Sequence, residues 1–245
     1  MFIMKIYKVK KIKKVGKDHP FLISGIKMLS DALVIKIMGA AALLISSLLM
    51  LLVAADVEAR KDVVTAMFYS VSLSLIFIAS KVASIIADLF FIIGAERASA
   101  EDPKIKNAII FSVIGMVSDA AFIVQHFLFN SSWVTMILSS VASCCAAFIV
   151  EIIFIKGTVR AVKGIDDEKT EMRGSRLLIM IAVSFAVKLI AHLFCVIDYF
   201  AIVYVLPIVL VVAASAISVI EYVLIILFIK GSKKKLAAND EDLIE

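Results

Sequence analysis

The stretch IFIASKVASIIADLFFIIG, residues 76–94, decides how this chain must fold. It is apolar enough to sit in a lipid bilayer, yet it contains Lys81 and Asp88, seven residues apart. Because an α-helix turns about 100° per residue, this spacing is nearly two turns and places both charges on one helix face. Similar isolated charges recur in apolar stretches at Glu151 and Glu221. The pattern predicts a membrane protein whose helices carry buried charges.

The composition places most of the chain in a membrane. Of the 245 residues, 62% are hydrophobic, and the mean hydropathy is +1.06. A soluble domain is about 45–50% apolar. Apolar runs of about 20 residues, the length that crosses a bilayer, recur along the whole sequence. We therefore expect an all-α, polytopic membrane helix bundle with six transmembrane helices. The expected helices are 32–55, 63–94, 108–129, 133–156, 177–199 and 206–230.

The sequence divides into three parts. Residues 1–30 are predicted to form a basic cytoplasmic tail that ends in a short interfacial helix at 21–29. Residues 31–231 form the six-helix transmembrane domain. Residues 232–245 form a charged cytoplasmic tail, which we expect to be disordered because it is polar and terminal.

Polar residues set the expected start of the first transmembrane helix. Ser30 or Asp31 can cap it, because both side chains accept hydrogen bonds from free N–H groups of a first turn. Lys36 then lies just inside the cytoplasmic end of the helix. From there its ammonium group is expected to snorkel to the lipid headgroups.

Lysine and arginine residues predict the orientation. An even number of spans puts both termini on one side, and nearly all lysines and arginines of the loops lie on that side. By the positive-inside rule this side is cytoplasmic, so the chain is N-in and C-in. No other targeting signal is visible in the sequence, and we expect the plasma membrane. The lysines of residues 1–17 would contact anionic lipid headgroups.

The helix ends hint at an internal repeat. Three of the predicted helices end FFIIG, IFIKG and LFIKG, at Gly94, Gly157 and Gly231. Asp88 and Glu151 each stand six residues before their glycine. This spacing favours three tandem antiparallel hairpins, although short apolar segments also match by chance.

Four charges are predicted in the middle of the membrane. At about 1.5 Å per residue they lie roughly 15–20 Å from the cytoplasmic helix ends, in a hydrocarbon core about 30 Å thick. They are Lys81, Asp119, Lys188 and Glu221. Each would cost about 2.5–3.5 kcal/mol if it stayed alone, so we predict ion pairs. Lys81 would pair with Asp119 and Lys188 with Glu221, or the lysines would exchange partners.

Other polar residues extend this charged interior. Asp88 and Glu151 lie shallower, roughly 9 Å from the cytoplasmic end, and are expected to form a vestibule. His192 follows Lys188 by one helical turn. The full candidate pathway is Lys81, Asp88, Asp119, Glu151, Lys188, His192 and Glu221. Neutral oxygen ligands for it would come from Ser80, Ser84, Ser139 and Ser143.

Two classes of function fit this pattern. The first is a transporter or channel for a small solute or ion, with the mid-membrane charges as its cation or proton site. The second is a membrane scaffold, assembly factor or accessory subunit that transports nothing, whose buried charges are structural ion pairs. A protein partner would then dock on the loop of residues 157–176, although a solvated helical extension and a turn is the simpler interpretation of this loop.

Other classes are disfavoured. His192 and Cys195 stand three residues apart, so a thiol and a base could meet, but no other catalytic motif accompanies them. We expect no enzyme activity and no cofactor. The net charge of +5 is explained by membrane topology rather than by nucleic-acid binding. All three cysteines lie in apolar runs and suggest neither a disulfide framework nor a metal site.

Overall fold

The computed structural model of the chain is all-helical. It describes residues 20–60, 63–100, 102–127, 133–163, 168–197 and 205–241. The elements are α2 (Pro20–Arg60), α3 (Val63–Ser99), the 3-10 helix η1 (Pro103–Lys106), α4 (Asn107–Phe127), α5 (Trp133–Lys163), α6 (Glu168–Ile197) and α7 (Val205–Glu241). Within these ranges six helices are long and apolar enough to cross a membrane, as the sequence predicted. The basic residues 1–17 and residues 128–132 and 242–245 lie outside the described part.

The first helix differs from its prediction. α2 begins at Pro20 and continues without interruption, so the structure has neither a separate helix at 21–29 nor a cap at Ser30 or Asp31. Proline is tolerated in a first helical turn, where its missing N–H is not needed. From there Ile26, Leu29 and Leu33 are buried at helical spacing, and this continuous apolar face keeps the helix unbroken.

The C-terminal helix is also longer than predicted. α7 continues to Glu241, so most of the C-terminal tail that was expected to be disordered is helical. α5 extends to Lys163 and α6 starts at Glu168, so residues 157–163 and 168–176 are helical, in agreement with the helical extension predicted for this segment. The hydrophobic pattern alone places a helix end where the apolar run stops. Lysine, arginine and glutamate are good helix formers, however, so a helix can continue beyond the apolar run into the solvent.

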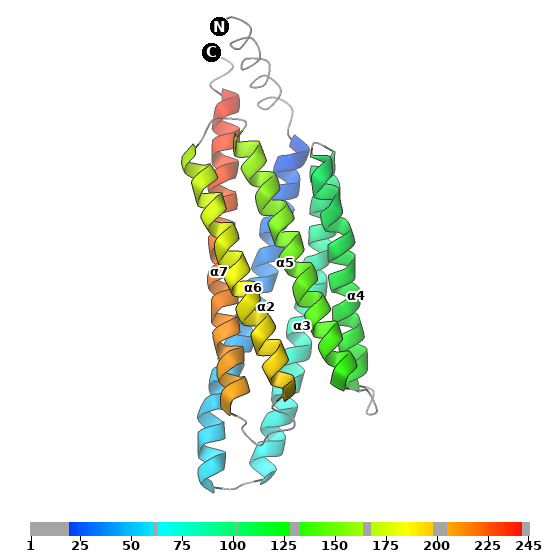
Figure 1. Cartoon of the computed structure of the whole chain (residues 1–245), viewed down its shortest axis with the longest axis vertical. Helices are drawn as coiled ribbons and strands as arrows, with labels where there is room; N and C mark the ends of the chain where they lie inside the picture. The colour runs from blue at the N-terminus through cyan, green and yellow to red at the C-terminus, as the bar shows by residue number, and fades with distance from the viewer. Residues whose placement is uncertain are drawn as a thin grey trace, which may run out of the picture.

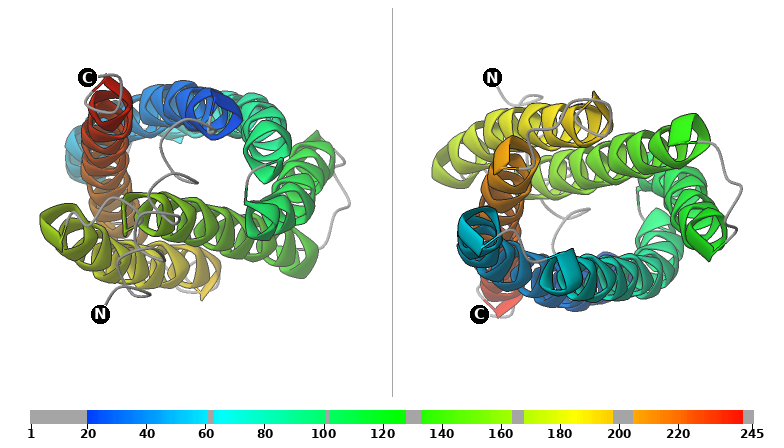
Figure 2. Two further views of the ribbon diagram at one scale, coloured as in Figure 1. Left: turned by 90° about the horizontal axis from the view of Figure 1, so that it is seen from above. Right: turned by 90° about the horizontal axis from the view of Figure 1, so that it is seen from below.

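The six long helices form a closed ring in chain order. Each helix packs on the next one, and α7 packs back on α2. Figure 2 shows this helix ring from both ends, with α2 and α7 side by side. Successive helices run in opposite directions, so α2 begins and α7 ends at the same end of the ring (Figure 1). That this end is cytoplasmic stays a prediction.

Small residues allow the closest helix approach. A Cβ atom built on Gly25 of α2 would lie only 2.5 Å from the carbonyl oxygen of Gly94 on α3. Gly157 lies against the side chain of Ile105, whereas a Cβ on Gly231 would meet nothing within 4 Å. The three glycines that suggested a repeat therefore have unlike surroundings, and the repeat stays a prediction.

The outer surface of the helix ring is more apolar than that of a soluble protein. Many large apolar side chains point outward, and Met38, Leu52 and Ile179 are each about two-thirds exposed. Charged side chains such as Asp119 and Glu221 are buried, with exposed fractions of 0% and 1%. An apolar outer surface of this extent is stable where lipid tails cover it. The fold is therefore compatible with a multi-pass integral membrane protein.

Candidate functional site: a charged cavity inside the helix ring

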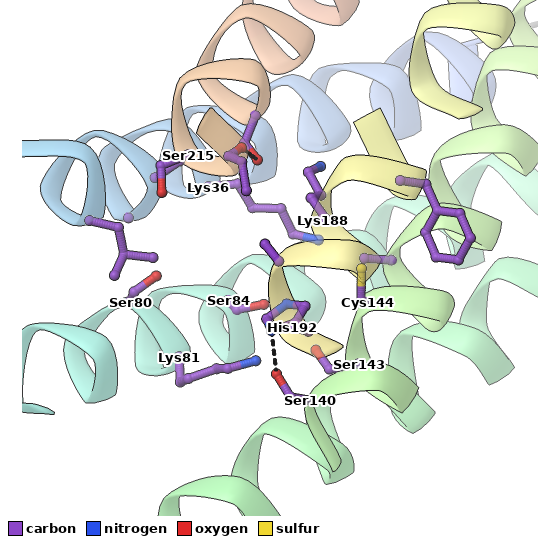
Figure 3. A pocket seen from close by; sticks show the side chains of 18 of the residues that line it. Lys36, Ser80, Lys81, Ser84, Ser140, Ser143, Cys144, Lys188, His192 and Ser215 are labelled. Atoms are coloured by element: carbon purple, nitrogen blue, oxygen red, sulfur yellow. Dashed lines mark hydrogen bonds between the residues drawn. The ribbon is translucent and has the colours of Figure 1, made fainter. Parts of the chain in front are cut away.

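A cavity of about 340 Å³ lies inside the helix ring, and we call it the central cavity. All six long helices contribute to its wall. The charged side chains that line it are Lys36, Lys81, Glu151, Lys188 and Glu221. Figure 3 shows the three lysines and His192 around the cavity, with serine hydroxyls between them. Ligand pockets have volumes of about 300–1,000 Å³, so the central cavity can hold a small organic molecule.

The first predicted ion pair is present. The Nζ atom of Lys81 on α3 lies 2.7 Å from Oδ1 of Asp119 on α4. Asp119 is fully buried, and its other oxygen, Oδ2, has no hydrogen-bond partner. The ring of Phe122, one turn beyond Asp119, lies 5.4 Å from the Lys81 ammonium and adds a cation–π contact. Lys81 lines the cavity, whereas Asp119, its partner, does not.

The second predicted pair joins α6 to α7. The Nζ atom of Lys188 lies 2.5 Å from Oε2 of Glu221. The same oxygen accepts a hydrogen bond from the hydroxyl of Ser184, at 2.5 Å. The ring of Tyr222 lies 5.0 Å from the lysine ammonium. Both pairs are thus the ones first predicted, and the exchanged pairing does not occur.

A third ion pair was missed. Lys36 Nζ on α2 lies 3.4 Å from Oδ1 of Asp88 on α3, and it also faces the ring of Phe91 at 4.7 Å. Lys36 is 7% exposed and stands at the midpoint of the candidate span Ile23–Leu49. The expectation that it snorkels to headgroups is therefore wrong. It followed from starting the helix at residue 32 instead of Pro20, which removes about three turns of depth.

The predicted vestibule is also corrected. Asp88 is buried against Lys36 and lies so close to Gly115 of α4 that a Cβ there would be 2.9 Å from its Oδ2. It does not line the central cavity. Glu151 does line it, but beside Glu221, which was expected deeper. Asp88 and Glu151 therefore lie in different surroundings and do not form one vestibule.

Glu151 is the acid without a lysine of its own. Its exposed fraction is 4%, and among the described residues it forms no ion pair. Its Oε1 atom has no hydrogen-bond partner, nor has Oε1 of Glu221, whose carboxyl group neighbours that of Glu151 in the cavity wall. Lys188 and Lys36 are the lysines whose charges act on it, and each is already paired with another acid.

The remaining predicted residues are divided between the cavity and its surroundings. His192 lines the cavity and its Nδ1 lies 3.1 Å from the hydroxyl of Ser140; the side chain of Cys195 lies outside the described part. The serines that line the cavity include Ser80, Ser84 and Ser143. Ser139 instead donates to Gln125 and to the carbonyl of Thr135. No cluster of three or more metal-ligating side chains occurs among the described residues.

The structure thus brings five of the seven predicted site residues to one cavity. They are Lys81, Glu151, Lys188, His192 and Glu221. Comparison of the chain with protein-family models, with curated proteins and with solved structures finds no match. Its function must therefore be inferred from its own residues.

Proposed function

We propose that the chain is a multi-pass membrane transporter or channel for a small solute or cation. The observation that supports this is the central cavity, which five charged side chains line in the interior of an apolar helix ring. Ion pairs that only lock helices together do not require empty space beside them, because close packing stabilises them. Charged groups beside a cavity can exchange partners with a solute that enters it.

The three lysines suit this role as internal counter-ions. Each is already held by a carboxylate, so Asp88, Asp119 and Glu221 stay compensated when the cavity is empty. A cation that approaches Glu221 can share its carboxylate with Lys188 without leaving either charge alone. On this proposal the charged layer is the binding site of the transported species. The proposal also includes the orientation of the protein, with both termini in the cytoplasm, and its location in the plasma membrane.

The experiment is a flux measurement with purified protein in liposomes. Proton and alkali-cation flux would be followed for the wild type, Asp119→Asn and Glu221→Gln. Asp102→Asn is the matched control, because Asp102 pairs with Arg160 at the surface, 2.6 Å apart, and does not line the cavity. We expect flux in the wild type and the control and its loss in both interior variants. Equal flux in all four proteins would contradict the proposed site.

A second function is supported by the way the pairs connect the helices. Lys36–Asp88 joins α2 to α3, Lys81–Asp119 joins α3 to α4, and Lys188–Glu221 joins α6 to α7. Pairs between neighbouring helices are what a membrane scaffold or accessory subunit would use to fix its fold.

The two proposals make different predictions for the same proteins. If the chain is a scaffold, Asp119→Asn and Glu221→Gln lower thermal stability, and no protein carries flux under any gradient. A protein partner would then be retained during purification through residues 157–176. Deleting the exposed charges of that segment would release the partner, and anionic lipid at residues 1–17 would remain an additional contact.

A further inference from the structure

We infer that the central cavity binds one small organic monocation, a protonated amine, whose ammonium group neutralises Glu151 in exchange for a proton. The inference names a substrate class for the transport function proposed above and rests on it. Four observations lead to it: a count of interior charges, the surroundings of Glu151, the size of the cavity and the chemistry of its wall.

The first observation is that the interior of the helix ring is one positive charge short. Its described ammonium groups belong to Lys36, Lys81 and Lys188, and its carboxyl groups belong to Asp88, Asp119, Glu151 and Glu221. Each lysine forms an ion pair with one acid, and this leaves Glu151 over. An uncompensated charge in an apolar interior is strongly unfavourable. The interior therefore calls for one more positive charge beside Glu151.

The second observation concerns the groups that face Glu151. On α7 these are Glu221 and Tyr222, on α6 Lys188 and on α2 Lys36. Four carboxyl groups of the interior face only three lysines, so on this inference one proton is held between Glu151 and Glu221 when the cavity is empty. Glu221 keeps its bonds to Lys188 and Ser184. The Oε1 atoms of Glu151 and Glu221 both lack a hydrogen-bond partner, and Glu151 is the acid of the two that no lysine holds, so its Oε1 is the acceptor that we assign to a ligand.

The third observation is the size of the cavity. Its volume of about 340 Å³ is roughly ten times the share of one water molecule in the liquid, about 30 Å³. A bare monovalent ion would fill a small part of it. A ligand of about ten non-hydrogen atoms, with an ammonium group at one end, would fill much more. Volume therefore favours an organic cation over an inorganic one.

The fourth observation is an aromatic wall next to the acid. Phe148 on α5 stacks on Phe185 of α6, with ring centroids 4.2 Å apart and ring planes 16° from parallel. Both line the cavity, and Phe148 precedes Glu151 by three residues, on the same face of α5. A carboxylate beside an aromatic surface suits an amine with an apolar body, because the ammonium pairs with the acid and the body packs on the rings.

These groups define an exchange with balanced charge. The amine enters as R–NH₃⁺ and donates a hydrogen bond to Glu151, and the proton held by the Glu151–Glu221 pair leaves to solvent. The interior carries the same net charge before and after. Lys188 and Lys36 stay paired with Glu221 and Asp88 throughout, so the helix contacts that they make are preserved.

The test measures binding and proton release together. Phenethylammonium chloride is titrated into the purified full-length protein in detergent micelles and followed by calorimetry, in two buffers of different ionisation enthalpy. The neutral phenethyl alcohol is the matched ligand control. We expect the amine to bind and to release about one proton per molecule, and the alcohol to bind at least tenfold more weakly.

Variants assign the effect to one side chain. Glu151→Gln is expected to weaken amine binding at least tenfold and to abolish the proton release, while Glu151→Asp keeps the release. Glu96→Gln, an exposed glutamate on α3, is the control and should behave like the wild type. Glu151→Gln removes the unpaired acid, so its melting temperature should equal or exceed that of the wild type, which verifies folding.

The outcomes separate this inference from the proposed function. Wild-type affinity in Glu151→Gln, equal binding of the alcohol, or amine binding without proton release would each overturn the exchange at Glu151. Alkali-cation flux in liposomes without amine binding would overturn this inference and leave transport standing. Proton-linked amine binding without any flux of that amine would support the site and overturn the transport function.

Discussion

Replacing Lys36 by methionine is the sharpest test of the pairing that the structure adds to the sequence prediction. At 3.4 Å and an effective dielectric constant of about 20, the attraction between Lys36 and Asp88 is about 5 kcal/mol. Part of it offsets the desolvation of both groups, but removal of one partner leaves the other buried and uncompensated. Such single removals cost about 3–5 kcal/mol. We expect Lys36→Met to lower the free energy of unfolding by that amount.

Asp88→Asn and the double variant are expected to differ from Lys36→Met in the free energy of unfolding. Asp88→Asn should cost less than Lys36→Met, because Lys36 then has Glu151 as a nearby acid to pair with. The double variant Lys36→Met/Asp88→Asn removes both charges and should be more stable than Lys36→Met alone. Reversible unfolding in mixed micelles measures all four proteins, and a double-mutant cycle isolates the pair's coupling energy.

The matched control is Lys27→Met, since Lys27 is an exposed lysine of the same helix. It should change the free energy of unfolding by no more than about 0.5 kcal/mol. If Lys36→Met behaves like Lys27→Met, or if the coupling energy is zero, then Lys36 faces the headgroups as the sequence alone suggested, and the third pair does not exist.

Two further variants test the packing and the second ion pair. Gly25→Ala should destabilise the crossing of α2 and α3 by about 1–3 kcal/mol, because its Cβ would press on the carbonyl oxygen of Gly94. Gly231→Ala, where a Cβ meets nothing within 4 Å, should stabilise by up to about 1 kcal/mol, and a loss there would show that the two sites do not differ as described. Ser184→Ala should cost about 1.5–3 kcal/mol, because it removes a buried hydrogen bond to the Glu221 carboxylate. Unchanged thermal unfolding of Ser184→Ala would mean that this hydroxyl does not contribute.

The parts of the fold that the sequence predicted depend on local pattern. Apolar runs of bilayer length located all six helices, because a span must satisfy its own backbone and stay apolar. The pairing of Lys81 with Asp119 and of Lys188 with Glu221 followed from depth, since the helices concerned are neighbours in the chain. Depth counted from a helix end is reliable only where that end is placed well.

Lys36 shows where this reasoning failed. Its helix was started at residue 32, so the residue was assigned to the headgroups, although Ile26, Leu29 and Leu33 continue the helical pattern ahead of it. With Lys36 set aside, four acids stood against two lysines, and nothing indicated which of the acids stays unpaired. The unpaired state of Glu151 could therefore not be recognised before the structure placed Lys36 beside Asp88.

Ring closure was beyond the sequence for another reason. α2 and α7 are separated by most of the chain, and no local pattern indicates that they pack together. The central cavity depends on that contact, because α2 and α7 both form part of its wall. Phe148 and Phe185 likewise meet only because α5 and α6 are adjacent in the ring. Side chains that look like ordinary apolar residues in the sequence thus become part of a site.

A central cavity that transports solutes must become accessible to water, and cysteine reactivity measures that accessibility directly. Cys144 lines the cavity, and its neighbour Cys145 on the same helix does not. One variant keeps only Cys144 and the other keeps only Cys145, with serine at the remaining cysteines, Cys195 included. Both would be treated in vesicles with a cationic methanethiosulfonate reagent that does not cross lipid. We predict modification of Cys144 from at least one side, slowed by phenethylammonium, and little modification of Cys145. A Cys144 that stays unmodified from both sides would contradict transport through the central cavity.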